Sequence, residues 1–156
     1  MQQELPKISE IRFNAMNFLA LREHSVKELK DKLSRKYAYA EQVEQAINEL
    51  TEQNLQSDER FAQAFVSMRQ RQGKGPVIIK MELRKKGVAA ELIAHFVDDT
   101  DPLWLELARD VRTKKFKGAA VINQQERAKQ MRFLHSRGFS SRHIQEAFTS
   151  VSADDY

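Results

Sequence analysis

The stretch Ile79–Gly87 reads Ile-Lys-Met-Glu-Leu-Arg-Lys-Lys-Gly, a basic run with apolar residues at helical spacing and a glycine at its end. Comparable basic runs occur at Leu29–Lys36 and Gln130–Gly138. The equivalent leucines of the three runs are Leu33, Leu83 and Leu134, which lie 50 and then 51 residues apart. A second apolar stripe follows each run at a matched distance. This spacing indicates an internal repeat, in which each helical unit buries its apolar face with help from its neighbours.

The repeat predicts an all-α fold of three tandem three-helix modules that form an elongated array, straight or curved. We place the modules at residues 1–56, 57–100 and 101–156 of the 156-residue chain. A three-helix unit of roughly 45 residues has a small core and is marginal alone. Neighbouring modules therefore either stack on one another or remain loosely joined.

Apolar periodicity and helix-capping residues predict three helices in each module. In the first module the expected helices are Ile8–Leu21, one capped by Ser25, and Ala40–Gln53. In the second they are one opening at Ser57-Asp58, one from Pro76 to Gly87, and a short one through Leu92–Val97. In the third they are one opening at Asp101-Pro102, one ending at Gly138, and one from Ser140 or Ser141 through Val151, with a loop at 116–124. The residues expected to face inward include Ile8, Ile11, Ala15, Phe18, Leu19, Val26, Leu29, Leu33, Val43, Ala46, Ile47, Leu50, Phe61, Phe65, Met68, Ile93, Phe96, Val97, Leu103, Trp104, Leu107, Ala108, Val111, Ile144, Ala147 and Phe148.

Two local patterns mark helix ends in the first module. Ser25 and Glu28 have the spacing of a capping box, in which each side chain bonds the other residue's backbone N–H. Asn54-Leu55 has the pattern of a helix stop, with the asparagine in the left-handed region and an apolar residue after it.

Positive charge is unevenly distributed along the chain, whose net charge is +4. Residues 1–56 carry a net charge of −1, whereas residues 57–100 carry +2 and residues 101–156 carry +3. Arg69–Lys86 contains seven basic residues and one acidic residue, and Arg109–Arg142 contains ten basic residues and two acidic residues. Such stretches suit a polyanion or an acidic protein surface, and a solvated helix face is the alternative interpretation.

Several classes of function find no support in the sequence. The absence of cysteine excludes disulfides, thiolate zinc sites and a cysteine nucleophile. The four histidines lack the spacing of a zinc site, although His135 and His143 flank one predicted turn. Gly73-Lys74-Gly75 lacks the remaining residues of a phosphate-binding loop. With no signal peptide or membrane-spanning run either, we expect a non-enzymatic, cytoplasmic protein without a cofactor.

The basic helices are the strongest candidates for function, because three of them at equivalent module positions would suit a regularly repeating anionic partner. The candidate partner- or DNA-binding residues are Arg22, Lys27, Lys30, Arg35, Lys36, Arg69, Arg71, Lys74, Lys80, Arg84, Lys85, Lys86, Arg127, Arg132 and Arg137. Lys85 and Lys86 lie at a predicted helix end, where their side chains reach solvent. Phe133 either stacks on a nucleic-acid base or packs in the core, and Trp104 is either structural or an interface anchor.

The motifs resemble those of the RecX family of regulatory proteins. The similar segments are Leu21–Leu29, Arg60–Val66, Gly75-Pro76 with Ile79, Leu83 and Lys86-Gly87-Val88, and Leu134–Phe139, which together extend over residues 12–148 in the family's order. The family pattern falls on Arg22, His24, Ser25, Glu28, Leu29, Arg60, Phe61, Gly75, Pro76, Leu83, Lys86, Gly87, Arg137 and Gly138. The resemblance implies no catalytic residue, and it leaves open which of these positions serve the fold and which serve function.

The resemblance implies tandem three-helix modules and a modulator of the RecA recombinase. Family members bind in the groove of the RecA filament, limit its ATPase, strand-exchange and co-protease activities, and contact DNA, thereby modulating recombination, DNA repair and the SOS response. The partners expected here are the RecA filament and single- or double-stranded DNA. The alternative function is a direct DNA-binding protein of helix-turn-helix type. No feature of the sequence requires a dimer, so we expect a monomer.

Overall fold

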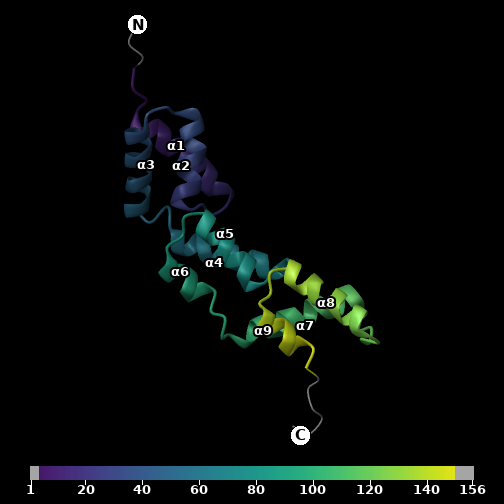
Figure 1. Ribbon diagram of the computed structural model, residues 1–156. Coiled ribbons are helices and arrows are strands. Elements are labelled where there is room, and N and C mark those ends of the chain that lie inside the picture. Colours follow the sequence, from purple (N-terminus) through teal and green to yellow (C-terminus); the bar gives the residue numbers. More distant parts are fainter. Residues whose placement is uncertain (1–3, 150–156) are drawn as a thin grey trace. The chain divides into compact units, whose positions relative to one another are not determined.

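The computed structural model describes residues 4–149, in which nine α-helices and no strand occur (Figure 1). The helices are α1 (Ile8–Leu21), α2 (Val26–Lys36), α3 (Ala40–Glu52), α4 (Asp58–Arg71), α5 (Pro76–Lys85), α6 (Ala90–Phe96), α7 (Pro102–Phe116), α8 (Gln124–Ser136) and α9 (Ser141–Ala147). The prediction of an all-α chain is confirmed. Contacts divide the chain into two compact units, and the division passes through α4, α5 and α6.

The first unit contains residues up to Phe65 together with Leu83–Ile93. In it, α1, α2 and α3 pack on one another around a single apolar cluster. The buried members of this cluster are Ile11, Ala15, Leu29, Leu33, Tyr37, Val43, Ala46, Ile47 and Leu50. Each predicted inward position of the first module lies in this cluster or packs against it.

The connection between α2 and α3 has no glycine, and Tyr37 forms the end of α2 instead. Its backbone is extended, and its N–H donates to the carbonyl oxygen of Leu33 at 2.8 Å. The ring is buried in the core, while the hydroxyl contacts Asn14 and donates to Glu10. A buried tyrosine with a satisfied hydroxyl anchors the chain here, where the other modules use glycine.

The helix stop predicted after α3 is confirmed. Asn54 has a φ of 60°, as the sequence indicated. The N–H of Leu55 donates to the carbonyl of Leu50 at 2.9 Å, while the Leu55 side chain is 41% exposed. Gln56 is buried in its place, and its amide donates to the carbonyl of His24 and to Asp58.

The second unit contains Val66–Glu82 together with the residues from Ala94 onward. Its cluster is formed where α7, α8 and α9 pack together, with Ala108, Leu134, Phe139, Ile144 and Ala147 buried. Trp104 is buried as well, and its indole N–H donates to the carbonyl of Asp98 at 2.9 Å. The structural interpretation of Trp104 therefore holds.

Two residues of the predicted apolar stripes in this unit are exposed. Leu103 is 42% exposed, because the buried line of α7 runs through Trp104 and Ala108, four residues apart. Met68 on α4 is 37% exposed. The apolar faces predicted for α7 and α4 are therefore wider than the parts of these helices that are buried.

The predicted helix boundaries hold at most positions. Pro76 begins α5, and Asp101 caps α7 by accepting from the N–H of Leu103. Ser140, rather than Ser141, caps α9. The predicted loop is confirmed at residues 117–123. The last helix ends at Ala147, and Val151, which was expected to continue it, lies outside the described residues.

A close backbone approach joins the start of α5 to the turn after α8. The N–H of Gly75 donates to the carbonyl of Arg137 at 2.8 Å, and the N–H of Val77 donates to that of Gly138 at 2.9 Å. A β-carbon on Gly75 would lie 2.5 Å from the carbonyl of Gly138. Gly138 has a φ of +94°, and a β-carbon there would lie 2.7 Å from Ile78. Only glycine fits either position, since any side chain would separate the two segments.

The core positions predict the cost of shortening a leucine. Leu83 is fully buried, so Leu83→Ala should lower the free energy of unfolding by about 2–5 kcal/mol through lost burial and the cavity left behind. Leu21 is 84% exposed, and Leu21→Ala should change it by less than about 0.5 kcal/mol. Urea denaturation followed by circular dichroism measures both. Equal effects of the two substitutions would contradict the burial of Leu83.

Candidate functional site

The basic residues proposed from the sequence occupy different environments in the structure. Arg22, Arg69, Lys80 and Lys86 form ion pairs with acidic side chains; Lys27, Lys36 and Arg71 donate to neutral groups; and Arg127 and Arg137 lie over aromatic rings. Lys30, Arg35, Lys74, Arg84, Lys85 and Arg132 have no side-chain partner within residues 4–149. Among the last group, only Lys74 is not classed as exposed. The exposed cations without a partner are therefore the ones most available to an outside partner.

Glu28 is the point at which several of the family-pattern residues meet. Its side chain is only 9% exposed. Arg22 donates to both carboxylate oxygens, at 3.0 and 2.9 Å, and Lys86 donates at 3.1 Å. The predicted capping box is also present, since Glu28 accepts from the N–H of Ser25 at 3.2 Å and the Ser25 hydroxyl accepts in return. One carboxylate thus links the end of α1, the start of α2 and the residue after α5.

Lys27, next to Glu28, contacts the backbone around Gly87. The ammonium of Lys27 donates to the carbonyl of Lys85 at 2.8 Å, which satisfies an acceptor at the end of α5. Gly87 has a φ of +78°, and a β-carbon there would lie 2.9 Å from that of Lys27. Lys85 is exposed, as expected from the sequence. Lys86 also reaches solvent, with 39% of its side chain exposed, although its ammonium is held by Glu28.

A second set of polar contacts in the first unit ties α2 to α4. The carboxylate of Asp58 accepts from the N–H of Val26 at 2.9 Å, across 32 residues of sequence. The guanidinium of Arg60 donates to Glu23 at 3.1 Å and to both oxygens of Asn54. The sequence indicated only a helix start at Asp58 and did not predict its hydrogen bond to Val26.

The environment of Glu28 favours its ionised form. Burial by itself would raise the pKa of this carboxyl group, but the hydrogen bonds from Arg22, Lys86 and the Ser25 N–H outweigh that effect and lower the pKa to about 2. Nearby, burial lowers the pKa of His24, whose Nδ1 lies 3.0 Å from the carbonyl of Arg22 and whose Nε2 lies 2.8 Å from the Lys32 ammonium. With Nδ1 protonated, a neutral His24 satisfies both contacts.

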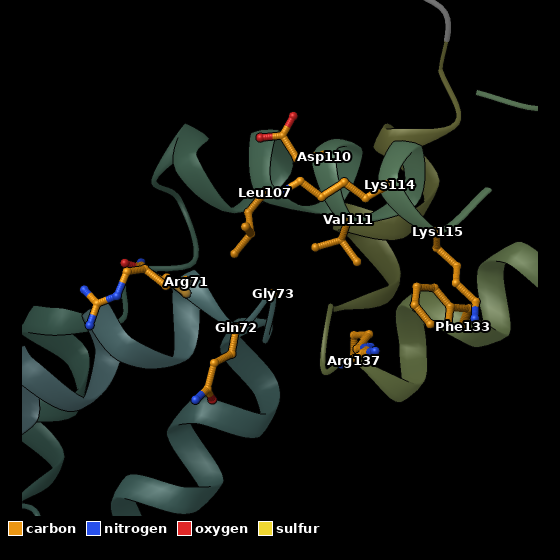
Figure 2. Close-up of a pocket in the computed structure, with 11 residues that line it drawn as sticks. Arg71, Gln72, Gly73, Leu107, Asp110, Val111, Lys114, Lys115, Phe133 and Arg137 are labelled. Carbon is orange, nitrogen blue, oxygen red and sulfur yellow. The ribbon is translucent and has the colours of Figure 1, made fainter. Parts of the chain in front are cut away.

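The second unit has a pocket of about 420 Å³ between the end of α4, α7 and the end of α8 (Figure 2). Leu107 and Val111 of α7 point toward the segment around Gly73. Phe133 and Arg137 come from α8 and the residue after it. The lysines of the lining, Lys114 and Lys115, were not among the residues chosen from the sequence, because their loop-flanking position carried no motif.

The two histidines that flank the turn after α8 lie in different environments. His143 is buried, with Nδ1 2.9 Å from the Ser140 hydroxyl and Nε2 3.1 Å from the carbonyl of Asp99. His135 is exposed. In the part of the chain that the structure describes, no three histidine or acidic side chains come together as a metal-ligand set, and no helix combines the length and apolarity needed to cross a membrane.

The Glu28 contacts predict a pH-dependent contribution to stability. Because the folded-state pKa is about 2 and the ordinary value is 4.5, this contribution is complete above pH 4.5 and is lost as the pH falls toward 2. Glu28→Gln should lower the free energy of unfolding at pH 7 by about 2 kcal/mol, a value reduced for the solvent exposure of Arg22 and Lys86. Urea denaturation of both proteins from pH 7 to pH 2 measures the difference. A difference that stays constant over this range would contradict the assignment.

Comparison with known proteins shows the same three-part organisation. Residues 14–50, 57–95 and 103–148 match family models described as the first, second and third three-helix domains of RecX. These ranges show three tandem domains, while the boundaries proposed from the sequence, at residues 56 and 100, stay a prediction.

The similarity extends to whole proteins and to solved structures. Regulatory protein RecX of Pseudomonas fluorescens (strain Pf-5) is 38% identical over 97% of both chains. Regulatory protein RecX of Halorhodospira halophila is 36% identical over 93% of this chain and 90% of its own. The crystal structure of RecX from Lactobacillus salivarius superposes with a TM-score of 0.76 and 25% identity, over 90% of this chain and 93% of that one. With three domain matches and these full-length relatives, the chain belongs to the RecX family of regulatory proteins.

Proposed function

We propose that this protein is a non-enzymatic regulator that binds the RecA recombinase filament in its groove and inhibits the filament's ATPase, strand-exchange and co-protease activities. It would thereby modulate recombination, DNA repair and the SOS response in the cytoplasm. Membership of the RecX family is the observation that carries the proposal. The distribution of basic residues adds physical support.

The exposed cations are suited to a repeating anionic partner. Lys30 and Arg35 lie on α2, Arg84 and Lys85 on α5, and Arg132 on α8, each without a side-chain partner among the described residues. Because they make no internal ion pair, binding does not have to break one. Such charges mainly accelerate association and orient the complex, and their effect weakens with salt.

The other candidate cations have a more limited role in this proposal. Arg22 and Lys86 already bind Glu28. If either side chain moved to a partner, the buried carboxylate would lose one of its two paired cations, which is unfavourable. We therefore assign partner contact to the exposed group and structural support to the Glu28 group. This division separates basic residues that were grouped together as candidates from the sequence.

The test is the single-strand-DNA-dependent ATPase rate of RecA, measured against increasing amounts of this protein. Inhibition at well below one molecule per RecA subunit would support binding along the filament with blocked growth or induced disassembly. No inhibition at saturating concentration would refute the proposal. Sequence-selective DNA binding without any effect on RecA would favour the helix-turn-helix alternative instead.

A paired substitution tests the assignment of the exposed cations. Arg84→Gln combined with Lys85→Gln should raise the half-inhibitory concentration about tenfold, equivalent to roughly 1.4 kcal/mol of binding free energy, while the melting temperature is preserved. Arg142→Gln is the control, because Arg142 is a 62% exposed arginine that lies outside the proposed contact set. Unchanged inhibition by the folded double variant would remove this end of α5 from the contact surface.

A further inference from the structure

Lys32, on α2, is a half-buried lysine without an acidic partner. It forms no ion pair within residues 4–149. Its ammonium instead lies 2.8 Å from Nε2 of His24, a residue that is only 1% exposed. The ring of Phe18 lies close as well, with 4.9 Å between the ammonium and the ring centre. The nearest group able to take a proton from this lysine is therefore an imidazole nitrogen.

The His24 ring is held so that its free nitrogen faces the lysine. Nδ1 lies 3.0 Å from the carbonyl oxygen of Arg22, which can only accept, so Nδ1 carries the proton and Nε2 has the lone pair. The backbone of His24 is also held, because its carbonyl accepts from the buried amide of Gln56 at 3.2 Å. The pair thus has the arrangement of a nucleophile and its base, within hydrogen-bond reach of each other.

The surroundings favour the neutral amine of Lys32 more than those of an ordinary surface lysine. Burial lowers the pKa of this group, and the nearby charge of Arg22 lowers it further, whereas Glu28 acts in the opposite direction. The carboxylate of Glu28 is itself paired with Arg22 and Lys86. A lysine that is desolvated or close to another cation is a better nucleophile near neutral pH.

We infer that Lys32 is a modification site at which an acyl phosphate acylates the side-chain amine, with His24 as the proton acceptor. Nε2 of His24 accepts one proton of the ammonium, and the neutral amine attacks the carbonyl carbon of the acyl group. The C–N bond forms as the bond from that carbon to the phosphate oxygen breaks, and phosphate leaves with the electron pair. The second proton of the nitrogen and the proton held by His24 pass to water.

The charge around the site explains the choice of acyl donor. Arg22 and Lys86 are both partly exposed and add positive charge beside Lys32. An acyl phosphate carries its negative charge on the leaving group, so these cations attract the reagent and stabilise the phosphate that departs. The product is a neutral amide in place of an ammonium, where α2 packs against the segment after α1.

The inference goes beyond the proposed function, because it concerns a chemical modification that needs no recombinase. The test treats the purified protein with acetyl phosphate at neutral pH and follows the acetylation of each lysine by fragmentation mass spectrometry. Lys32 should be acetylated at least about tenfold faster than Lys30, the matched lysine on the same helix. Lys30 is exposed and has no side-chain partner among the described residues, so access alone would favour Lys30.

His24→Asn removes the proton acceptor and should lower the Lys32 rate to about that of Lys30. His135→Asn, at an exposed histidine of the second unit, is the matched control and should leave both rates unchanged. Melting temperatures confirm folding, and wild-type protein unfolded in urea gives the same comparison if His24→Asn does not fold. Equal rates at Lys32 and Lys30 in the native protein would overturn the inference. So would a preference for Lys32 that persists in urea or in folded His24→Asn.

Discussion

The ionised carboxylate of Glu28 is the constraint on which the first unit depends. A buried charge costs several kcal/mol unless its oxygens are well paired, and here Arg22, Lys86 and the Ser25 N–H together meet that requirement. The three donors come from different segments, so a single group fixes the end of α1, the start of α2 and the residue after α5. Lys27 and Gly87 pack against one another immediately beside it. Part of the positive charge of this region, that of Arg22 and Lys86, therefore stabilises the fold.

Local chemistry explains what could be predicted from the sequence. The capping box at Ser25, the start of α5 at Pro76 and the stop at Gly138 each depend on a few neighbouring residues, and all three predictions were confirmed. Contacts across long sequence separations were not predictable, because a single sequence gives no pairing information. Lys86 and Glu28 are 58 residues apart, and the pocket lysines Lys114 and Lys115 carry no motif. The exposed Leu103 shows that apolar periodicity locates a face but not its limits.

The structure places the candidate cations in two kinds of environment that the sequence does not distinguish. Arg22 and Lys86 are engaged with a buried acid, and Arg137 is held over Phe133, whereas exposed residues such as Lys30 and Arg84 have no partner within the described residues. Substitutions of Arg22 and Lys86 should act through stability, and we propose that those in the exposed group act through binding. Loss of activity in a variant is therefore informative about the partner surface only when stability is measured alongside it.

The account is tested most directly by a double-mutant cycle between Glu28 and Lys86, with Glu28→Gln and Lys86→Met made singly and together. Urea denaturation at pH 7 gives the free energy of unfolding of each protein. The account predicts a coupling energy of at least about 1 kcal/mol, because the pair is close and the carboxylate is buried. The control cycle combines Glu28→Gln with Arg132→Met. Arg132 is an exposed residue of the second unit without a side-chain partner among residues 4–149, so this cycle should be additive within about 0.3–0.5 kcal/mol. Additivity in the Glu28–Lys86 cycle would contradict the claim that this carboxylate joins α2 to the end of α5.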